Sequence, residues 1–304
     1  MDALILAPLR GVTSRTFREV FSRHFGGLDE AVAPFIPTVE GARVKPRLLN
    51  DVQPVVASPS LVPQVLGKDP ASFRVMLGAL RELGHSRVNL NSGCPWPMVV
   101  RRGRGSGLLA NESALAGMLE AGCDVLGNKF SVKVRLGIDD TTLLLKRMPL
   151  FNQFPLEELI IHGRTARQMY EGNVDVDAFA RAAEVCTNRV VYNGDIFTLE
   201  GFLRLKQRFP HITRWMIGRG VLRNPVLCES IKAGRELPLD VARVMAFHND
   251  YLDATRAELF GDKPVLGRMK ELWFYLHHAV PRGEKLLRSI QLCATVEEYR
   301  SIIG

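Results

Sequence analysis

Eight short apolar runs recur along this 304-residue chain, and segments with helical periodicity separate them. The runs are residues 4–6, 30–33, 62–65, 87–90, 130–135, 158–162, 189–193 and 215–217. Strands that alternate with helices pair in parallel through right-handed crossovers, and eight such units can close into a barrel. The pattern therefore predicts an α/β fold, a (β/α)8 TIM barrel, with an open doubly wound sheet as the main alternative.

Most of these runs carry polar side chains or glycine at their carboxyl ends. Examples are Gln64, Asn91, Lys133, Arg135 and His162. A single polar residue at such a position is usually just solvated. The carboxyl ends of the strands in a parallel barrel meet on one face, however, and active sites are built there. The repeated pattern therefore predicts a functional pocket on that face.

A cysteine follows the fourth run on a tight turn, in the sequence Asn91-Ser92-Gly93-Cys94-Pro95. Most free cysteines are small buried hydrophobes, and we interpret Cys123, Cys186, Cys228 and Cys293 in this way. Cys94 differs because glycine and proline flank it and a glycine-rich segment with Arg101, Arg102 and Arg104 follows. Nearby cations favour a reactive thiol. We therefore expect Cys94 to face a pocket and the three arginines to contact a polyanion.

Two glycine-containing segments follow the last two runs, Asn193-Gly194-Asp195 and Gly218-Arg219-Gly220. Barrels commonly bind phosphate at these positions, because glycine lets backbone amides approach the ligand and arginine can neutralise it. A single Gly-Arg-Gly is more often a simple turn. The paired spacing favours a phosphate site.

Composition narrows the class of protein. The five cysteines are scattered, so neither a disulfide framework nor a metal site is indicated. The first residues lack the features of a signal peptide and no apolar run approaches membrane-spanning length, so we expect a cytoplasmic protein without a membrane partner. The formal net charge of +8 permits a nucleic-acid partner without identifying it.

The pattern changes to longer helical periodicity after residue 236. Apolar positions recur over 241–259 and 266–278, and residues 262–264 separate the two segments. We therefore predict a barrel domain over 1–236 and a small all-helical domain over 237–304. The aromatic stretch 272–276 could form a stacking platform for bases, but at helical spacing we expect Trp273 and Leu276 in the core. Tyr275 and His277 remain open.

In this order, the motifs of the chain resemble the tRNA-dihydrouridine synthases, from Leu6 to about Leu276. The matching segments are 7–13 with Phe17-Arg18, 64–67, 91–95, 132–137, 162–165, 193–196 and 217–220. The segment 268–273 resembles the helical RNA-binding domain of the same family. The arrangement is most similar to the bacterial C-type subgroup, which modifies uridine 16 in the D-loop of tRNA.

The resemblance implies an oxidoreductase that binds FMN and receives electrons from NADPH or NADH. Separately from the resemblance, we expect a monomer. Hydride would pass to carbon 6 of uracil, and Cys94 would donate a proton to carbon 5. The residues implied to bind the flavin ring or its side chain are Pro8, Leu9, Arg10, Gln64, Lys133 and His162. Those implied to bind its phosphate are Asn193, Gly194, Asp195, Gly218 and Arg219.

The resemblance also implies how tRNA is bound. Asn91 and Arg135 would contact the target uracil, which leaves the RNA fold to reach the barrel. Arg101, Arg102, Arg104, Arg268 and Lys270 would hold the tRNA backbone. The chain departs from the family pattern at Leu9, Ser14 and Asn89, and at Trp96-Pro97-Met98 after the cysteine. The last departure puts the closure of this loop in question.

Two other functions stay open at this stage. An FMN-dependent oxidoreductase of a free pyrimidine, of the dihydroorotate or dihydropyrimidine type, would act without RNA and leave the helical domain unexplained. A non-catalytic barrel that binds tRNA would be colourless and leave Cys94 and Lys133 without a purpose.

Overall fold

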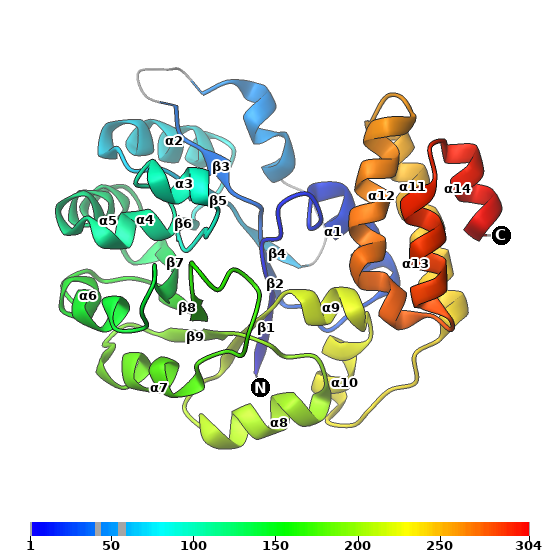
Figure 1. The fold of residues 1–304 in the computed structure, drawn as a ribbon. Coiled ribbons are helices and arrows are strands. Elements are labelled where there is room, and N and C mark those ends of the chain that lie inside the picture. Colours follow the sequence, from blue (N-terminus) through cyan, green and yellow to red (C-terminus); the bar gives the residue numbers. More distant parts are fainter. Residues whose placement is uncertain (1, 40–43, 54–58, 304) are drawn as a thin grey trace.

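The computed structural model describes residues 2–39, 44–53 and 59–303 (Figure 1). Its parallel strands form one 10-stranded sheet in the order β3-β5-β6-β7-β8-β9-β10-β1-β2-β4. The strands are β1 (Ala3–Leu6), β2 (Glu30–Val32), β3 (Ile36–Pro37), β4 (Ser60–Val62), β5 (Gln64–Leu66), β6 (Val88–Ser92), β7 (Phe130–Gly137), β8 (Glu158–Thr165), β9 (Val190–Asn193) and β10 (Arg214–Ile217). The prediction of a TIM barrel is confirmed.

The barrel closes through a bend at Pro63. β4 pairs with β2 and β5 pairs with β6, and Pro63 alone separates β4 from β5. Proline has no N–H to give to a neighbouring strand, so it interrupts the ladder, although its carbonyl still accepts a hydrogen bond from the Asn89 N–H at 2.8 Å. The predicted run 62–65 is therefore one bent strand, and the short β3 is an addition to the predicted set.

Helices surround the barrel. They are α1 (Arg15–His24), α2 (Pro70–Glu82), α3 (Pro97–Arg101), α4 (Ser106–Ala110), α5 (Glu112–Leu126), α6 (Leu143–Phe151), α7 (Val176–Val185), α8 (Leu199–Arg208), α9 (Arg219–Arg223) and α10 (Leu227–Ala233). Side chains cap several of them: Ser14, Asp69, Asn111 and Thr198 each accept a hydrogen bond from an N–H in the first turn that follows. The short helices α3 and α4 follow β6 directly and precede α5.

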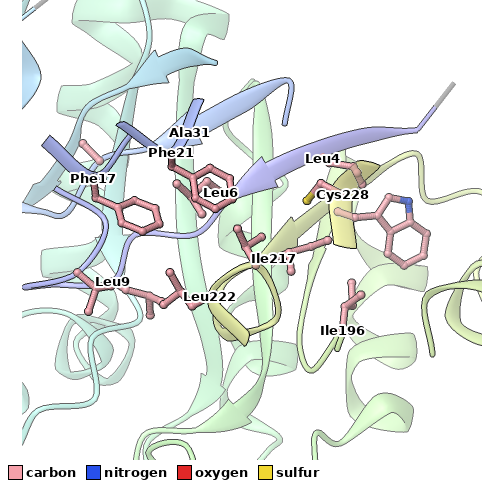
Figure 2. Close-up of a cluster of buried hydrophobic side chains, with 14 of the residues drawn as sticks. Leu4, Leu6, Leu9, Phe17, Phe21, Ala31, Ile196, Ile217, Leu222 and Cys228 are labelled. Atoms are coloured by element: carbon pink, nitrogen blue, oxygen red, sulfur yellow. The ribbon is translucent and has the colours of Figure 1, made fainter. Parts of the chain in front are cut away.

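Alternation along the strands divides the apolar residues into two cores. Ile5 and Met216 face the inside of the barrel, where they belong to a small cluster of buried residues. Leu4, Leu6 and Ile217 point to the other face and join the large core between the sheet and the helices. Figure 2 shows part of this outer core. The interior cluster is small, so the rest of the barrel interior is free to carry polar groups.

Charged residues meet at the amino-terminal ends of the strands, away from the predicted site. Arg87 lies between Glu30 and Glu157 at 2.5 and 2.8 Å, and Arg214 contacts Glu158 at 2.6 Å and Glu30 at 3.2 Å. The side chains of Glu30 and Glu158 are almost completely buried. Their carboxylates are retained in the interior because these arginines balance the charge.

The carboxyl-terminal helices are α11 (Val241–Glu258), α12 (Asp262–Leu276), the 3-10 turn η3 (His277–Ala279), α13 (Gly283–Leu292) and α14 (Val296–Ile303). They lie together on one side of the barrel (Figure 1). α12 begins at Asp262, so residues 262–264 form its first turn and do not break the helix. Pro264 is tolerated there because a first turn has no intrahelical N–H partners. Trp273 and Leu276 are buried, as predicted.

The helical segment is packed tightly against the barrel. Phe247 and Tyr251 of α11 meet Phe17 of α1 edge to face, at centroid distances of 5.8 and 5.9 Å. Arg243 forms two hydrogen bonds with Glu229 of α10, at 2.6 and 3.0 Å. Barrel and helices therefore share one continuous outer core. In the described part of the chain, we find no helix with the length and apolar character that crossing a membrane requires.

Candidate active site

A cavity of about 310 Å³ opens at the carboxyl ends of the barrel strands. Its lining contains most of the predicted site residues: Pro8, Leu9, Arg10, Asn91, Cys94, Lys133, Arg135, His162, Asn193, Gly194, Asp195, Gly218 and Arg219. They come from β1, β6, β7, β8, β9 and β10 or from the turns after these strands. The face on which the sequence predicted a pocket therefore carries one.

Several other lining residues were not predicted. They are Phe35, Trp96, Tyr170, Phe197, Glu271, Phe274 and Tyr275, among others. Glu271, Phe274 and Tyr275 belong to α12, so the helical segment forms one wall of the cavity. Tyr275, which the sequence left open, faces this cavity. Tyr170 follows the carboxyl end of β8, a position that strand assignment alone could have flagged.

The side chain of Asn91 shapes the turn that carries Cys94. Its Oδ1 accepts hydrogen bonds from the N–H groups of Gly93 and Cys94, at 3.1 and 2.8 Å. Asparagine side chains readily form turns of this kind, in which the amide oxygen accepts hydrogen bonds from backbone N–H groups two or three residues ahead. Cys94 is 6% exposed, and the surface it keeps faces the cavity. Asn91 therefore holds the thiol in place.

The glycine-rich segment closes over this turn. Gly105 has a φ of +55°, and a Cβ on it would lie 2.7 Å from the Cβ of Cys94. The N–H of Ser106 donates to the Cys94 carbonyl at 3.0 Å. Glycine at 105 is thus required both by its backbone conformation and by close approach. The glycine-rich segment expected to contact a polyanion thus also supports the cysteine, through Gly105.

Burial raises the pKa of the Cys94 thiol. The Trp96 N–H, Arg135, Arg10 and Lys133 act in the opposite direction but do not cancel the effect. A thiol in a partly desolvated site stays protonated, because removing its proton would place a charge where water is scarce. Cys94 is therefore arranged to hold a proton at neutral pH.

Lys133 and Arg135 project from the same face of β7, because residues two apart in a strand point the same way. Burial, reinforced by Arg135, lowers the pKa of Lys133 to about 7. Burial first, and then Arg135 and Lys133, bring the pKa of His162 well below its usual value, so its imidazole is neutral. Lys133 and Arg135 thus lie on the floor of the cavity, where burial destabilises their charged forms. An anionic or electron-rich ligand would stabilise these charges.

Gln64 lies outside the cavity lining. It is completely buried, its Nε2 donates to Asn89 Oδ1 and its Oε1 accepts from Asn91 Nδ2, both at 2.8 Å. Asn89 in turn donates to Ser131 Oγ at 2.9 Å. In the structure, Gln64 links this interior network to Asn91, and through Asn91 to the Cys94 turn. Its contact with a flavin stays a prediction.

At the far end of the cavity, Arg164 and Arg219 hold the carboxylate of Asp195, with Arg219 at 2.6 Å. Burial alone would raise the pKa of Asp195, but hydrogen bonds and charge from the two arginines lower it. Gly218 leads directly into α9, and the first N–H groups of any helix lack partners within the helix. Small residues and unsatisfied amides of this kind suit an anion such as phosphate.

The five arginines and lysines assigned to the tRNA backbone fall outside the cavity lining. Arg101 and Arg102 are exposed at the end of α3. Arg104 is only partly exposed, and it follows them in the turn before α4. Arg268 pairs with Glu258 at 2.6 Å, and the Lys270 ammonium donates to the Gln291 and Cys293 carbonyls at 3.0 and 2.7 Å. The structure thus gives Arg268 and Lys270 partners within the helical segment, which ties α12 to α11 and to the end of α13.

Comparison with known proteins identifies the group to which this architecture belongs. Residues 5–301 match the family described as Dihydrouridine synthase (Dus). The chain belongs to the dihydrouridine synthase family. The family predicted from the motifs is therefore confirmed, and the match includes the helical segment as well as the barrel.

Curated relatives of this dihydrouridine synthase match most or all of its length. The tRNA-dihydrouridine(16) synthase of Ralstonia nicotianae is 28% identical over 100% of this chain and 98% of its own. The tRNA-dihydrouridine(16) synthase of Shewanella oneidensis is also 28% identical, over 99% of this chain and 96% of its own. The tRNA-dihydrouridine synthase B of Pseudomonas aeruginosa is 29% identical over 78% of this chain and 72% of its own. The two tRNA-dihydrouridine(16) synthases support the resemblance to the C-type subgroup.

Solved structures support the fold. TcOYE, solved with pHBA, superposes with a TM-score of 0.57 at 11% identity, over 82% of this chain and 94% of that one. Morphinone reductase, solved with tetrahydroNAD, gives a TM-score of 0.51 at 9% identity, over 80% and 89% of the two chains. At such low identity the likeness concerns the fold alone.

The positions at which this dihydrouridine synthase departs from the family pattern have clear local roles. Ser14 caps α1, with its hydroxyl accepting from the Phe17 N–H. Asn89 belongs to the interior network beneath Asn91. Leu9 is buried and lines the cavity. Trp96, in contrast, is 55% exposed at the cavity, directly after Pro95.

Proposed function

We propose that this protein reduces one uridine of tRNA to 5,6-dihydrouridine, at position 16 of the D-loop, with FMN as its cofactor and NADPH or NADH as the electron donor. One observation carries the proposal: Cys94 lines the same cavity as Lys133 and Arg135, at the mouth of a barrel whose family is named for this reaction. Position 16 rests on the full-length relatives that are named for it.

The residues around the cavity fit a flavin mononucleotide. A volume of about 310 Å³ lies at the lower end of the range of about 300–1,000 Å³ typical of cofactor sites. Apolar and aromatic side chains can cover a flat ring, and Lys133 offers a cation for the electron-rich edge of that ring. Gly194 and Gly218 line the cavity beside Arg219, where their backbone could approach a phosphate. Bound there, FMN would supply the hydride that saturates the uracil double bond.

Lys133 would stabilise negative charge on the bound ring system, and its desolvated ammonium makes this effect strong. His162 would act as a neutral hydrogen-bonding group, since burial keeps its pKa low. Arg135 is held by the carbonyls of Thr165 and Met169 at 2.7 and 2.6 Å, so it is positioned before any substrate arrives. A preorganised cation of this kind can bind a uracil carbonyl without rearrangement.

Cys94 would donate the proton that the reduced uracil needs at carbon 5. A general acid must carry its proton at the working pH, and burial secures this for Cys94 by raising its thiol pKa. Asn91 and Gly105 fix the turn, so the sulfur approaches the substrate from a defined direction. The proton returns to Cys94 from solvent after the product leaves.

The tRNA substrate is consistent with the charge of the protein. The net charge of +8 favours attraction to a polyanion, and Arg101 and Arg102 are exposed close to Cys94 in the chain. The target uridine has to leave the folded tRNA to reach the cavity, because the thiol lies inside the mouth of the barrel.

Position-by-position mapping of dihydrouridine tests this proposal. tRNA from cells with and without the gene should differ at position 16 alone, and the wild-type gene should restore the modification. The purified protein should be yellow and should reduce an unmodified tRNA transcript when NADPH is present. Reduction of free uracil or uridine without RNA, with tRNA unchanged, would replace the proposal with an oxidoreductase of free pyrimidines.

A further inference from the structure

Two aromatic side chains at the cavity mouth are unusually exposed. Trp96 is 55% exposed and Phe274 is 57% exposed, and both line the cavity. Large aromatic residues are normally buried, and those left in water beside a binding cavity usually meet a ligand. The other two tryptophans of the chain, Trp215 and Trp273, are fully buried.

The two side chains come from opposite sides of the mouth. Trp96 follows β6, and Phe274 lies on α12, which packs against α9 after β10. β6 and β10 are four positions apart in the closed ring of eight strands, so they face each other across the barrel. Figure 1 shows α3 to the left of the central strands and α12 to the right. Trp96 and Phe274 therefore line the cavity from elements on opposite sides of the barrel.

The backbone around Trp96 is stiff. Pro95 and Pro97 flank it, and a residue before proline is confined to extended conformations. Its φ and ψ are −59° and 127°, and its carbonyl accepts from the N–H groups of Val99 and Val100 at 2.8 and 3.0 Å. A stacking surface fixed in this way loses little entropy when it binds. Trp96 follows Cys94 by two residues, so the stacking surface and the thiol belong to the same turn.

The charges around the mouth select a polyanion. Arg101 and Arg102 are exposed on the same segment as Trp96, and Arg10 lies over the ring of Phe35 at 5.5 Å. The acidic residues Asp195 and Glu271 also line the cavity. The carboxylate of Asp195 is paired with Arg164 and Arg219, and Glu271 belongs to α12. Exposed aromatic rings interleaved with cations are the arrangement that binds single-stranded nucleic acid.

We infer that Trp96 and Phe274 form a clamp that stacks on the unpaired bases on either side of the uridine entering the cavity. The inference rests on the proposed function, since it takes the substrate to be RNA. It adds a preference for RNA in which the bases beside the target uridine are unpaired. Both are positioning residues. The clamp recognises the faces of neighbouring bases, while the cavity recognises the target base.

Tryptophan fluorescence of the flavin-loaded protein gives a direct test. Trp96 is the exposed tryptophan, so an unmodified tRNA transcript should quench its emission in a saturable way. A fully paired RNA duplex of similar length should not, at the same salt concentration. Trp96→Ala, measured by filter binding, should weaken tRNA affinity by about 5- to 150-fold, the loss expected for one base–aromatic stack, and Phe274→Ala should act similarly. Trp96→Phe should stay within about threefold of the wild type, because an aromatic face remains.

Matched variants separate stacking from general apolar contact. Met98, 69% exposed in α3 two residues after Trp96, lies outside the cavity lining, and Met98→Ala should leave tRNA affinity unchanged. If Trp96→Ala and Phe274→Ala bind tRNA as tightly as the wild type, the clamp is wrong. If Trp96→Ala loses flavin absorbance while its tRNA affinity is unchanged, Trp96 is a wall of the flavin site and not a clamp. A protein that shows the quenching but forms no dihydrouridine would contradict the proposed reaction and leave the clamp standing.

Discussion

The backbone of Gly105 lies directly against Cys94, at a distance that excludes any side chain at position 105. Gly105→Ala should therefore displace the cysteine turn and lower tRNA reduction at least tenfold while FMN stays bound. Gly127→Ala is the matched control, because Gly127 has a similar φ of +57° but no neighbour within 4 Å. Both variants should lose about 1–3 kcal/mol of stability from the strained backbone, and Gly105→Ala should lose more because its Cβ also overlaps Cys94. Equal activity of the two variants would show that the contact with Cys94 is unimportant.

The pKa of Lys133 makes FMN affinity depend on pH. Because this pKa is about 7 in the free protein, the ammonium loses its proton as the pH rises from 7 to 9, and the attraction for the anionic ligand falls. The Kd for FMN should rise over this range, by at most about tenfold per pH unit for a single proton. Fluorescence titration of the apoprotein measures it. Lys133→Met should bind FMN more weakly and with a flatter pH dependence, whereas the exposed Lys129→Met should behave as the wild type.

The charged network at the base of the barrel should be sensitive to loss of one partner. Arg214→Met leaves Glu158 and Glu30 buried with less compensation, which should cost about 3–5 kcal/mol in the free energy of unfolding. Arg204→Met removes an exposed pair with Glu200 and should cost less than about 1 kcal/mol. Urea unfolding of the two variants, both with FMN bound, compares them. Equal losses would mean that the buried network contributes no more than a surface ion pair.

His248 should make the helical segment sensitive to acid. Its ring is buried between α11, α12 and α14, hydrogen-bonded to Tyr299, which also accepts from the Trp273 Nε1–H at 2.6 Å. Burial lowers the pKa of His248 to about 4. The unfolded chain binds this proton near pH 6.5, so the stability that neutral His248 provides is complete above pH 6.5 and is lost as the pH falls through 4.

Thermal unfolding between pH 6.5 and 4 checks this effect. His248→Gln, which cannot titrate, should show a smaller fall in Tm over that range than the wild type, even if it starts lower. His211→Gln alters an exposed histidine and should keep the wild-type dependence. A pH dependence in His248→Gln as steep as in the wild type would assign the acid sensitivity to another group.

The barrel could be predicted from the sequence because the patterns that indicate its strands lie within short segments. Successive apolar residues in a strand, such as Leu4, Ile5 and Leu6, indicate that both faces of the strand are buried. The order of the strands then follows from right-handed crossovers. The bend at Pro63 and the short β3 escaped prediction, since both depend on how the ring closes. Residues at the carboxyl ends of strands, such as Lys133, were found in the cavity for the same topological reason.

Features that depend on contacts between distant segments could not be read from the sequence. Phe274 and Tyr275 reach the cavity because α12 packs beside α9. The sequence of either helix alone does not indicate this contact. Lys270 was assigned to RNA because it is a cation in a matching motif, but its partners are carbonyls more than 20 residues away. The hydrogen bonds of the buried Gln64 amide with Asn89 and Asn91 are another example, since they join separate strands.

The proton from Cys94 is the central claim, and the turnover of Cys94→Ala tests it most directly. Purified Cys94→Ala should keep its bound FMN and its reduction by NADPH. Its rate of dihydrouridine formation in unmodified tRNA should fall by about 10²- to 10⁴-fold, the usual contribution of a general acid. Cys123→Ala, at a partly exposed cysteine outside the cavity lining, should remain fully active. A Cys94→Ala enzyme that forms dihydrouridine within threefold of the wild-type rate would contradict the account.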